Sequence, residues 1–350
     1  MNKPTDIRTM SLQEIEKLVA ELGQPKFRSK QLYEWLHTHL AVSYDEMTNV
    51  PKALRQSLEE KFPLSAPNIV DKQVSRDGTR KYILELLDGS TVETVGMPTF
   101  NESDEDGRLS VCFSTQVGCP MGCEFCATGK EGFTRNLTAS EMIDQIIAVQ
   151  RDFDHRVSNL VAMGQGEPFL NYEELFTALR FLNDQNGPSI GARHITVSTC
   201  GLIDGINRFA QEPEQFTLAI SLHSAIKEKR DEIMPSMKNQ TLPMLRSALS
   251  SYIEKTNRRV TLEYLLIDGF NDGHEDLAAL RKFCRGLLVH VNLLPMNDIE
   301  GSPYRATKPE IVSDWLKGLE DAHIEATVRR SRGADIAGAC GQLKNSFNSR

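Results

Sequence analysis

The sequence lacks any apolar run long enough to cross a membrane. A spanning helix needs about 20 consecutive apolar residues, and the richest stretch, residues 216–226, is interrupted by serine and histidine. The first twenty residues carry acidic side chains in an amphipathic pattern and contain no hydrophobic secretory segment. We therefore expect a protein that has no membrane span and resides in the cytoplasm.

The sequence also has no excess of basic residues and no even number of cysteines. The chain has 40 lysines and arginines against 48 acidic residues, a net charge of −8, which disfavours a histone-like binder but permits a local basic face. Seven cysteines are an odd number in 350 residues, so metal binding or thiol chemistry is favoured over a disulfide framework. The ordinary globular composition and the length suggest two domains, or one barrel-sized domain with an appendage.

Three helical patterns occupy residues 1–70, which we predict to be a small accessory domain that binds RNA. Ser11 can cap the first helix, which ends before Gly23, and the third helix follows Pro51. The apolar period of the second helix runs through Leu32 and Leu36. A basic turn between two of the helices is read either as a solvated loop or as a nucleic-acid contact, and it contains Lys26, Arg28 and Lys30.

Residues 71–108 change to the alternating pattern of β-strands. Two such runs, residues 82–87 and 91–95, flank Asp88 and Gly89, a pair that is typical of a hairpin turn. The acidic stretch 101–107 that follows is read as a solvated linker. We therefore predict a β-hairpin extension joined by an acidic linker to the rest of the chain.

From residue 109 to about 345, strand and helix patterns alternate six times, which predicts a parallel α/β sheet. A closed eight-stranded barrel needs about 250 residues, so a partial (β/α)6 barrel fits better. The expected strands are Leu109–Ser114, Asn159–Met163, His194–Ser198, Phe216–Ser221, Val260–Ile267 and Val289–Pro295. The helices between them are expected at 139–153, 172–185, 203–210, 242–256, 275–287 and 309–322.

Three cysteines lie within eight residues of the loop after the first of these strands. Cys119, Cys123 and Cys126 have the spacing C-x3-C-x2-C. Soft thiolates select zinc, copper(I) or iron–sulfur clusters, and a structural zinc site usually has a second C-x2-C pair, which this chain does not contain. Three thiolates suit a [4Fe–4S] cluster with one open iron. The spacing, with Phe125 before the last cysteine, is similar to the radical S-adenosylmethionine (SAM) signature.

Polar residues follow the next strands at the points where the strands end. Catalytic groups of such folds lie at the carboxyl ends of the strands. These polar residues therefore predict one pocket. In the radical-SAM superfamily, a segment like Gly164–Pro168 binds SAM. The residues expected to contact SAM are Gly166, Glu167, Ser198, Ser221, Leu222, His223, Asn297 and Phe125. For His223, a satisfied histidine of the core is the alternative reading.

Two more cysteines stand apart from the cluster. Cys112 lies on the first core strand, where a buried small hydrophobe is the ordinary reading. Cys340 lies between small residues near the C-terminus, in a loop that suits a reactive thiol. Arg329, Arg330 and Arg332 precede that loop and are read as a solvated cluster or as phosphate contacts that position RNA.

Together these motifs resemble one family, the radical-SAM 23S ribosomal RNA adenine-C2 methyltransferases. The resemblance spans most of the chain, and its motifs are highly specific. The matching segments are Val92–Val95, Val111–Gly129, Gly132–Ile146, Met163–Tyr172, Ile220–Ser224 and Arg329–Leu343. Two positions depart from the family pattern: Gln165 stands where the family usually has methionine, and Cys200 stands where it usually has serine.

The resemblance implies a mechanism with two SAM molecules per turnover. One SAM methylates Cys340, and a radical made from the second SAM at the cluster takes a hydrogen atom from that methyl group. The resulting methylene radical adds to C2 of an adenine, and Cys112 then resolves the covalent adduct, which leaves a disulfide between Cys112 and Cys340. Glu93 is the proton acceptor by the same resemblance. The implied partners are 23S rRNA, transfer RNA and an electron donor of the flavodoxin type, and a monomer is the default.

Two alternatives remain open from the sequence. The related C8-type methyltransferase, which confers antibiotic resistance, shares the same cysteines, although Pro168 favours the C2 type. A zinc-stabilised RNA-binding module without catalysis would bind zinc and ignore SAM, but it would leave Cys340 unexplained. Neither regiochemistry nor the identity of the RNA follows from physical reasoning on these residues.

Overall fold

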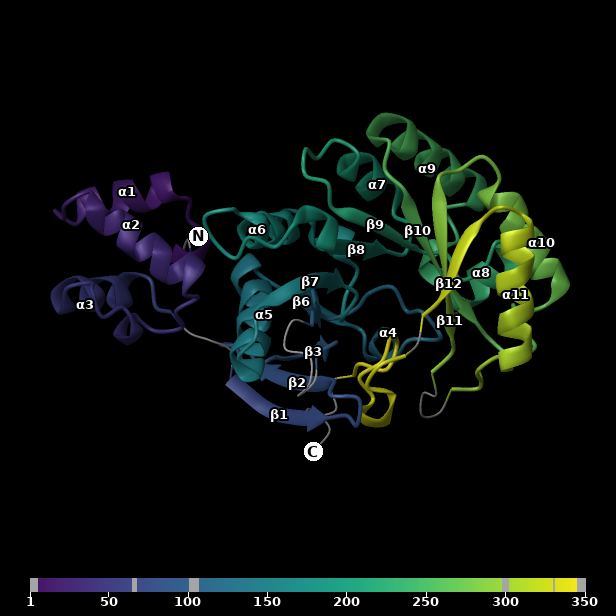
Figure 1. Cartoon of the computed structure of the whole chain (residues 1–350), viewed down its shortest axis with the longest axis horizontal. Helices are drawn as coiled ribbons and strands as arrows, with labels where there is room; N and C mark the ends of the chain where they lie inside the picture. Colours follow the sequence, from purple (N-terminus) through teal and green to yellow (C-terminus); the bar gives the residue numbers. More distant parts are fainter. Residues whose placement is uncertain (1–5, 65–67, 101–106, 298–301, 330, 345–350) are drawn as a thin grey trace.

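The computed structural model describes residues 6–64, 68–100, 107–297, 302–329 and 331–344. Within them, ten strands form one open, curved sheet in the order β1-β2-β3-β4-β7-β8-β9-β10-β11-β12 (Figure 1). The strands are β1 Asn68–Val74, β2 Arg80–Glu85, β3 Thr91–Pro98, β4 Leu109–Cys112, β7 Val157–Ala162, β8 Ile195–Thr199, β9 Thr217–Ser221, β10 Val260–Leu266, β11 Val289–Pro295 and β12 Glu325–Val328.

Within this sheet, the strands β4, β7, β8, β9, β10, β11 and β12 are all parallel, as the alternation of patterns predicts. All six predicted core strands are present, and the prediction of a partial barrel is confirmed. The prediction missed β12, because Glu325–Val328 is only four residues long and half of it is exposed. This seventh parallel strand leads directly into the loop that carries Cys340.

Six helices follow the parallel strands and pack against the outside of the sheet (Figure 1). The first begins at a capping box in which the Thr138 side chain and Glu141 bond each other's backbone N–H groups. Its apolar face, which includes Ile143, Ile146 and Ile147, is buried. The six helices are α5 Ala139–Phe153, α6 Tyr172–Asn183, α7 Ile203–Phe209, α9 Leu242–Thr256, α10 His274–Cys284 and α11 Pro309–Asp321.

The N-terminal helices have a hydrophobic core of their own, formed by residues between 7 and 58. Ser11 and Glu14 form the capping box of the first helix, as predicted for Ser11. An ion pair between the buried side chains of Arg8 and Asp144 joins these helices to α5. The helices are α1 Leu12–Glu21, α2 Phe27–Tyr33, which continues as a π-helical turn over Glu34–Thr38, and α3 Lys52–Lys61.

The predicted hairpin is formed by β2 and β3, with the turn at Asp88 and Gly89. It belongs to the main sheet, because β3 pairs antiparallel with β4 and sets Val95 opposite Cys112. The acidic linker, residues 101–107, lies outside the described residues except for Gly107. The edge strand β1, which pairs antiparallel with β2, was not predicted. Four short elements were also missed: β5 Gln116–Gly118, α4 Ala127–Glu131, β6 Phe133–Asn136 and α8 Lys227–Ile233.

No helix of the described residues is long and apolar enough to cross a membrane.

Candidate active site

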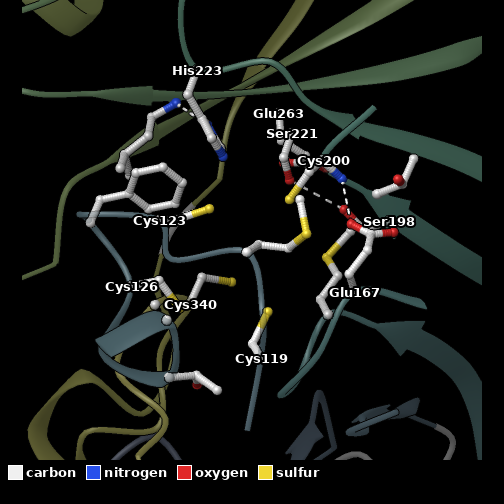
Figure 2. Close-up of a pocket in the computed structure, with 18 of the residues that line it drawn as sticks. Cys119, Cys123, Cys126, Glu167, Ser198, Cys200, Ser221, His223, Glu263 and Cys340 are labelled. Carbon is white, nitrogen blue, oxygen red and sulfur yellow. Dashed lines mark hydrogen bonds between the residues drawn. The ribbon is translucent and has the colours of Figure 1, made fainter. Parts of the chain in front are cut away.

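The carboxyl ends of the parallel strands surround one cavity, which Figure 2 shows from close by. The cysteine loop forms one wall, and the strand ends form the other. Its lining includes most of the residues that the sequence predicts for the site, namely Cys119, Cys123, Phe125, Cys126, Gly166, Glu167, Ser198, Ser221, His223 and Cys340. The fold therefore brings together side chains that lie far apart in the sequence.

The cysteine loop is held by backbone hydrogen bonds and by a glycine. The N–H of Cys119 donates to the carbonyl of Gly132 at 2.7 Å, and the N–H of Cys126 donates to the carbonyl of Cys123 at 3.1 Å. Gly118 has a φ of +74°, and a Cβ there would lie 2.1 Å from the Gly132 oxygen. The chain can therefore turn into the loop only with glycine at this position.

Burial raises the pKa of the Cys119 thiol to about 12 and also raises the pKa of the Cys126 thiol. Thiolates at these positions therefore need a compensating positive charge, which the irons of a cluster supply. Among the described residues, no three acidic, histidine or cysteine side chains converge as they would on a single ion. Thiols spaced around an open cavity fit a polynuclear cluster, which takes one thiolate on each of three irons.

The Glu167 carboxylate is fixed by two backbone donors. Its Oε2 accepts the N–H of Cys200 at 2.7 Å, and its Oε1 accepts the N–H of Phe169 at 3.0 Å. Burial raises the pKa of this carboxyl. The neighbouring Gly166 has a φ of +105°, and a Cβ there would lie 2.7 Å from the Gln116 side chain. The segment therefore presents a carboxylate in a fixed orientation at the end of β7.

His223 is neutral, because burial lowers its pKa to about 3. Its Nδ1 accepts the N–H of Leu265 at 3.1 Å, so the ring proton is on Nε2. The ring of Phe125 meets it edge to face, with 4.6 Å between the ring centres. Leu222 is fully buried and does not line the cavity; its N–H donates to the Glu263 carbonyl at 3.0 Å. The His223 ring, just after β9, therefore carries its proton on Nε2 and can donate a hydrogen bond from that atom.

Cys340 is exposed, Cys112 is buried, and both are free thiols. Burial raises the pKa of Cys112 to about 12, and the nearby Cys340 thiol acts in the same direction. Cys340 lines the first cavity, whereas Cys112 lines a second cavity that Cys340 also borders. Asn297 lines this second cavity and donates to the Cys340 carbonyl at 3.1 Å. Asn297 therefore holds the Cys340 loop and does not line the first cavity.

Glu93 lies on β3 and lines neither of the two cavities. Its Oε2 accepts the N–H of Lys344 at 2.9 Å, and its Oε1 lies 3.4 Å from the Lys81 ammonium. Burial raises the pKa of Glu93 to about 7, and Lys81 acts in the opposite direction. A carboxyl of this kind can take up and release a proton near neutral pH.

The two departures from the family pattern both have partners in the site. The Gln165 side chain accepts the N–H of Glu93 at 3.1 Å, and this hydrogen bond connects β3 to the loop after β7. A hydrogen bond with Cys123, together with burial, raises the pKa of the Cys200 thiol. Cys200 is thus a fourth thiol beside the cysteine loop (Figure 2).

Sequence reasoning missed Glu263, and it left two readings open for Arg329. Glu263 lines the first cavity, and burial raises its pKa; its only sequence signal is an acidic residue inside the apolar run Val260–Leu266. Arg329 does not form part of a solvated cluster: it lines both cavities, and the Cys340 thiol raises its pKa. Arg332 bonds the Pro98 carbonyl, and Arg330 lies outside the described residues.

Family models match two parts of the chain. Residues 5–64 match the N-terminal domain of ribosomal RNA large subunit methyltransferases, and residues 113–281 match the radical SAM superfamily. The fold and the site thus define a radical-SAM enzyme.

Relatives of known name match along nearly the whole chain. A probable dual-specificity RNA methyltransferase RlmN of Clostridium novyi is 40% identical over 98% of both chains. One from Staphylococcus aureus is 45% identical over 97% of this chain and 92% of its own. The crystal structure of a radical SAM methyltransferase from Sphaerobacter thermophilus is 42% identical, covers 97% of this chain and 99% of its own, and superimposes with a TM-score of 0.91.

The chain belongs to the RlmN family of radical-SAM RNA methyltransferases, which confirms the resemblance found in the sequence. It is accordingly an enzyme whose cofactors are SAM and a [4Fe–4S] cluster.

Proposed function

We propose that this enzyme methylates C2 of one adenine in 23S rRNA, adenine 2503 in the family, and of an adenine in transfer RNA, by way of a methylated Cys340. One observation carries the proposal: Cys340 borders both the cavity of the cysteine loop and the cavity of Cys112. A thiol in that position can receive a methyl group in the first cavity and be released from the RNA adduct by Cys112 in the second.

Ordinary methyl transfer does not suit this target. C2 of adenine lies between two ring nitrogens and is not a nucleophile. It therefore has no electron pair with which to attack the electrophilic methyl group of SAM. SAM and the reduced cluster together supply both a methyl group and a means of removing a hydrogen atom. The chain must therefore carry the methyl group on a side chain of its own, and Cys340 is the exposed thiol at the cavity.

The residues of the first cavity would hold the two cofactors. Cys119, Cys123 and Cys126 would bind three irons of the cluster and leave the fourth to SAM. The fixed carboxylate of Glu167 suits the amino group of SAM, and the Nε2 proton of His223 suits an acceptor on it. Further contacts would come from Phe125, Gly166, Ser198 and Ser221, which line the first cavity. Leu222 and Asn297 do not line it, so they would act only indirectly, by holding the strand end and the Cys340 loop.

The second thiol would complete the turnover. The Cys112 thiolate attacks the Cys340 sulfur, the bond from that sulfur to the new methylene group breaks, and the carbon takes up a proton to become the methyl group on C2. The two sulfurs are left as a disulfide, which two electrons from a thiol reductant reopen. Before Cys112 attacks, the radical adduct must lose the proton on C2 together with one electron, which an iron–sulfur cluster can accept. Glu93 is the proposed acceptor of that proton, and its pKa of about 7 supports that role.

Arg329 supports this use of the two thiols. It lines both cavities, and its positive charge lowers the pKa of Cys112 against the effect of burial. A cation beside Cys112 favours the thiolate that this residue must become in order to attack. We further propose that the enzyme works as a monomer in the cytoplasm and receives its electron from a flavodoxin-type protein.

Mass spectrometry of nucleosides from an rRNA fragment tests the proposal. The anaerobically reconstituted enzyme is given SAM and a reductant, and we expect 2-methyladenosine with the wild type and none with Cys340→Ala. Both proteins should hold the same amount of iron, because Cys340 is not among the proposed ligands. Formation of 8-methyladenosine would assign the enzyme to the C8 type, and no methylated adenine from the wild type would reject the proposed substrate.

A further inference from the structure

Helix α8 carries a buried cation that lines neither of the two cavities. The Arg230 side chain is 2% exposed. In the part of the chain that the structure describes, no carboxylate forms an ion pair with its guanidinium, and the adjacent Asp231 pairs with Lys227 instead. An arginine keeps its charge in a protein, and a buried charge is costly unless a partner balances it. Arg230 therefore indicates that a negative group binds nearby.

Two carbonyl groups at the strand ends bind this guanidinium. Its Nε donates to the Leu222 carbonyl at 3.3 Å, and its Nη2 donates to the Cys200 carbonyl at 2.6 Å. Leu222 follows β9, and Cys200 follows β8. Carbonyl groups carry only a partial negative charge, so they satisfy the N–H donors without balancing the full positive charge.

Helix α8 also contacts the cysteine loop. The Glu124 N–H donates to the carbonyl of Ile233, the last residue of α8, at 3.0 Å. Ile233 belongs to the same apolar cluster as Cys123, and Cys200 packs against that cluster. Burial lowers the pKa of Arg230, whereas the nearby Cys200 and Cys123 sulfurs act in the opposite direction. The cation therefore lies beside the loop whose thiols become negative when they bind iron.

We propose that Arg230 is the counter-ion of the [4Fe–4S] cluster and raises its reduction potential. The inference rests on the proposed ligand set, Cys119, Cys123 and Cys126. Three thiolates outweigh the positive charge of the oxidised iron–sulfur core, so the bound cluster is negative, and the electron from the donor makes it more negative. Net charge is one of the properties that set the potential of such clusters. Because Coulomb attraction grows with charge, a buried cation stabilises the reduced form more than the oxidised form.

Arginine suits this position better than the other basic groups nearby. Its planar fork of N–H donors can bind both carbonyls while the side chain keeps its charge. His223, which lies at the same strand ends, cannot supply the charge, because burial lowers its pKa to about 3 and Arg230 acts in the same direction. Arg230 is thus a positioning residue, which would act on the cluster through its charge and without contact to the substrate.

Redox titration of the anaerobically reconstituted holoenzyme tests the inference. Arg230→Gln removes the charge and keeps a donor for the carbonyls, whereas Arg230→Lys keeps the charge. At a fixed potential, we expect the ratio of reduced to oxidised cluster to fall about tenfold in Arg230→Gln, which corresponds to about 59 mV for a one-electron couple. Arg230→Lys should restore most of this ratio. Electron paramagnetic resonance of the reduced cluster measures it. Lys238→Gln, which removes an exposed charge just after the turn Pro235–Met237, is the control and should not change it.

Iron content measured in parallel separates an electrostatic role from a structural one. A wild-type potential in Arg230→Gln, or an equal loss of bound iron in Arg230→Gln and Arg230→Lys, would overturn the inference. Loss of the cluster in Arg230→Gln alone would support it, because Arg230→Lys retains the charge. No RNA is present in the titration, so a wild-type enzyme that fails to methylate adenine would reject the proposed substrate and leave this result standing.

Discussion

The cysteine loop and the pair formed by Cys112 and Cys340 are two thiol sites built in different ways. The loop places its three cysteines within eight residues, and backbone hydrogen bonds inside and around the loop shape it. The pair joins a core strand to a C-terminal loop that the rest of the barrel separates in sequence. Short-range structure therefore suffices to place the three thiols proposed as cluster ligands, whereas the two thiols proposed to exchange a covalent bond are brought together only by the whole fold.

This difference fits the demands of the two sites. Cluster ligands must keep fixed mutual positions, which a short loop ensures. In the proposed mechanism, Cys340 contacts a cofactor, a base and a second thiol in turn, and its thiol is exposed. The Asn297 side chain and the Ala127 N–H donate hydrogen bonds to the backbone carbonyls of its loop. Four predictions test this contrast, beginning with the largest effect.

Cys126→Ala removes one member of the loop, and we expect both bound iron and methyl transfer to be lost. With two thiolates left, a cluster lacks the ligand set that holds it. Iron analysis and the brown absorbance measure this directly. Cys284→Ala, which removes a buried cysteine from α10, is the matched control and should retain iron. Full iron content in Cys126→Ala would show that the loop is not the ligand set.

Cys112→Ala removes one member of the pair, and the expected result is of another kind. The cluster should remain, but the chain should accumulate in covalent linkage to RNA, because nothing attacks the Cys340 sulfur. Denaturing gels with labelled RNA would reveal a band of added mass that depends on SAM and disappears in the double variant with Cys340→Ala. Free methylated RNA at the wild-type rate would show that Cys112 does not resolve the adduct.

Glu93→Gln addresses the strand that supports the pair. Burial raises the pKa of Glu93 from 4.5 to about 7, so between these values the folded chain binds more protons than the unfolded chain. The contribution of this pKa shift to the free energy of unfolding is present in full at low pH, and it is lost as the pH rises from 4.5 through 7. The loss amounts to up to about 3 kcal/mol. We expect Glu93→Gln to remove this decline, measured by urea unfolding at pH 5 and pH 8; an equal decline in both proteins would contradict the shift.

Cys200→Ser asks whether the fourth thiol beside the loop belongs to the ligand set. Serine preserves a small hydrogen-bonding side chain, and the backbone N–H that Glu167 accepts is unaffected. We expect iron content to be unchanged and kcat/KM to change less than about fivefold, or about 1 kcal/mol. A large loss of iron would mean that Cys200 is a ligand and that the loop alone is not enough.

Much of the fold could be predicted from local sequence. Helices α5 and α9 begin and end where their apolar period and caps predict, and Asp88–Gly89 forms the expected turn. The strand β12 and the element α4 were missed because a strand of four residues and a helix of five carry too little periodic signal. These short elements depend on neighbours that the sequence does not reveal.

The site divides in the same way. The residues of the cysteine loop and most of those at the strand ends were predicted and lie around one cavity, but Leu222 and Asn297 do not line it. Glu263 was missed because a single acidic residue in an apolar strand has no motif around it. For Arg329, the sequence left open a solvated cluster and a phosphate contact, and the structure excludes the first because its side chain lines both cavities.

The sequence by itself determined the metal chemistry, since the spacing of three cysteines and the glycine that turns their loop are local properties. Only the tertiary structure decided that Cys340 lies between two cavities and that Cys112 borders just one of them. The physical reason is that residue spacing limits distance only over a few residues. Beyond that, the register of parallel strands and the path of the loop after β12 decide which thiols can meet.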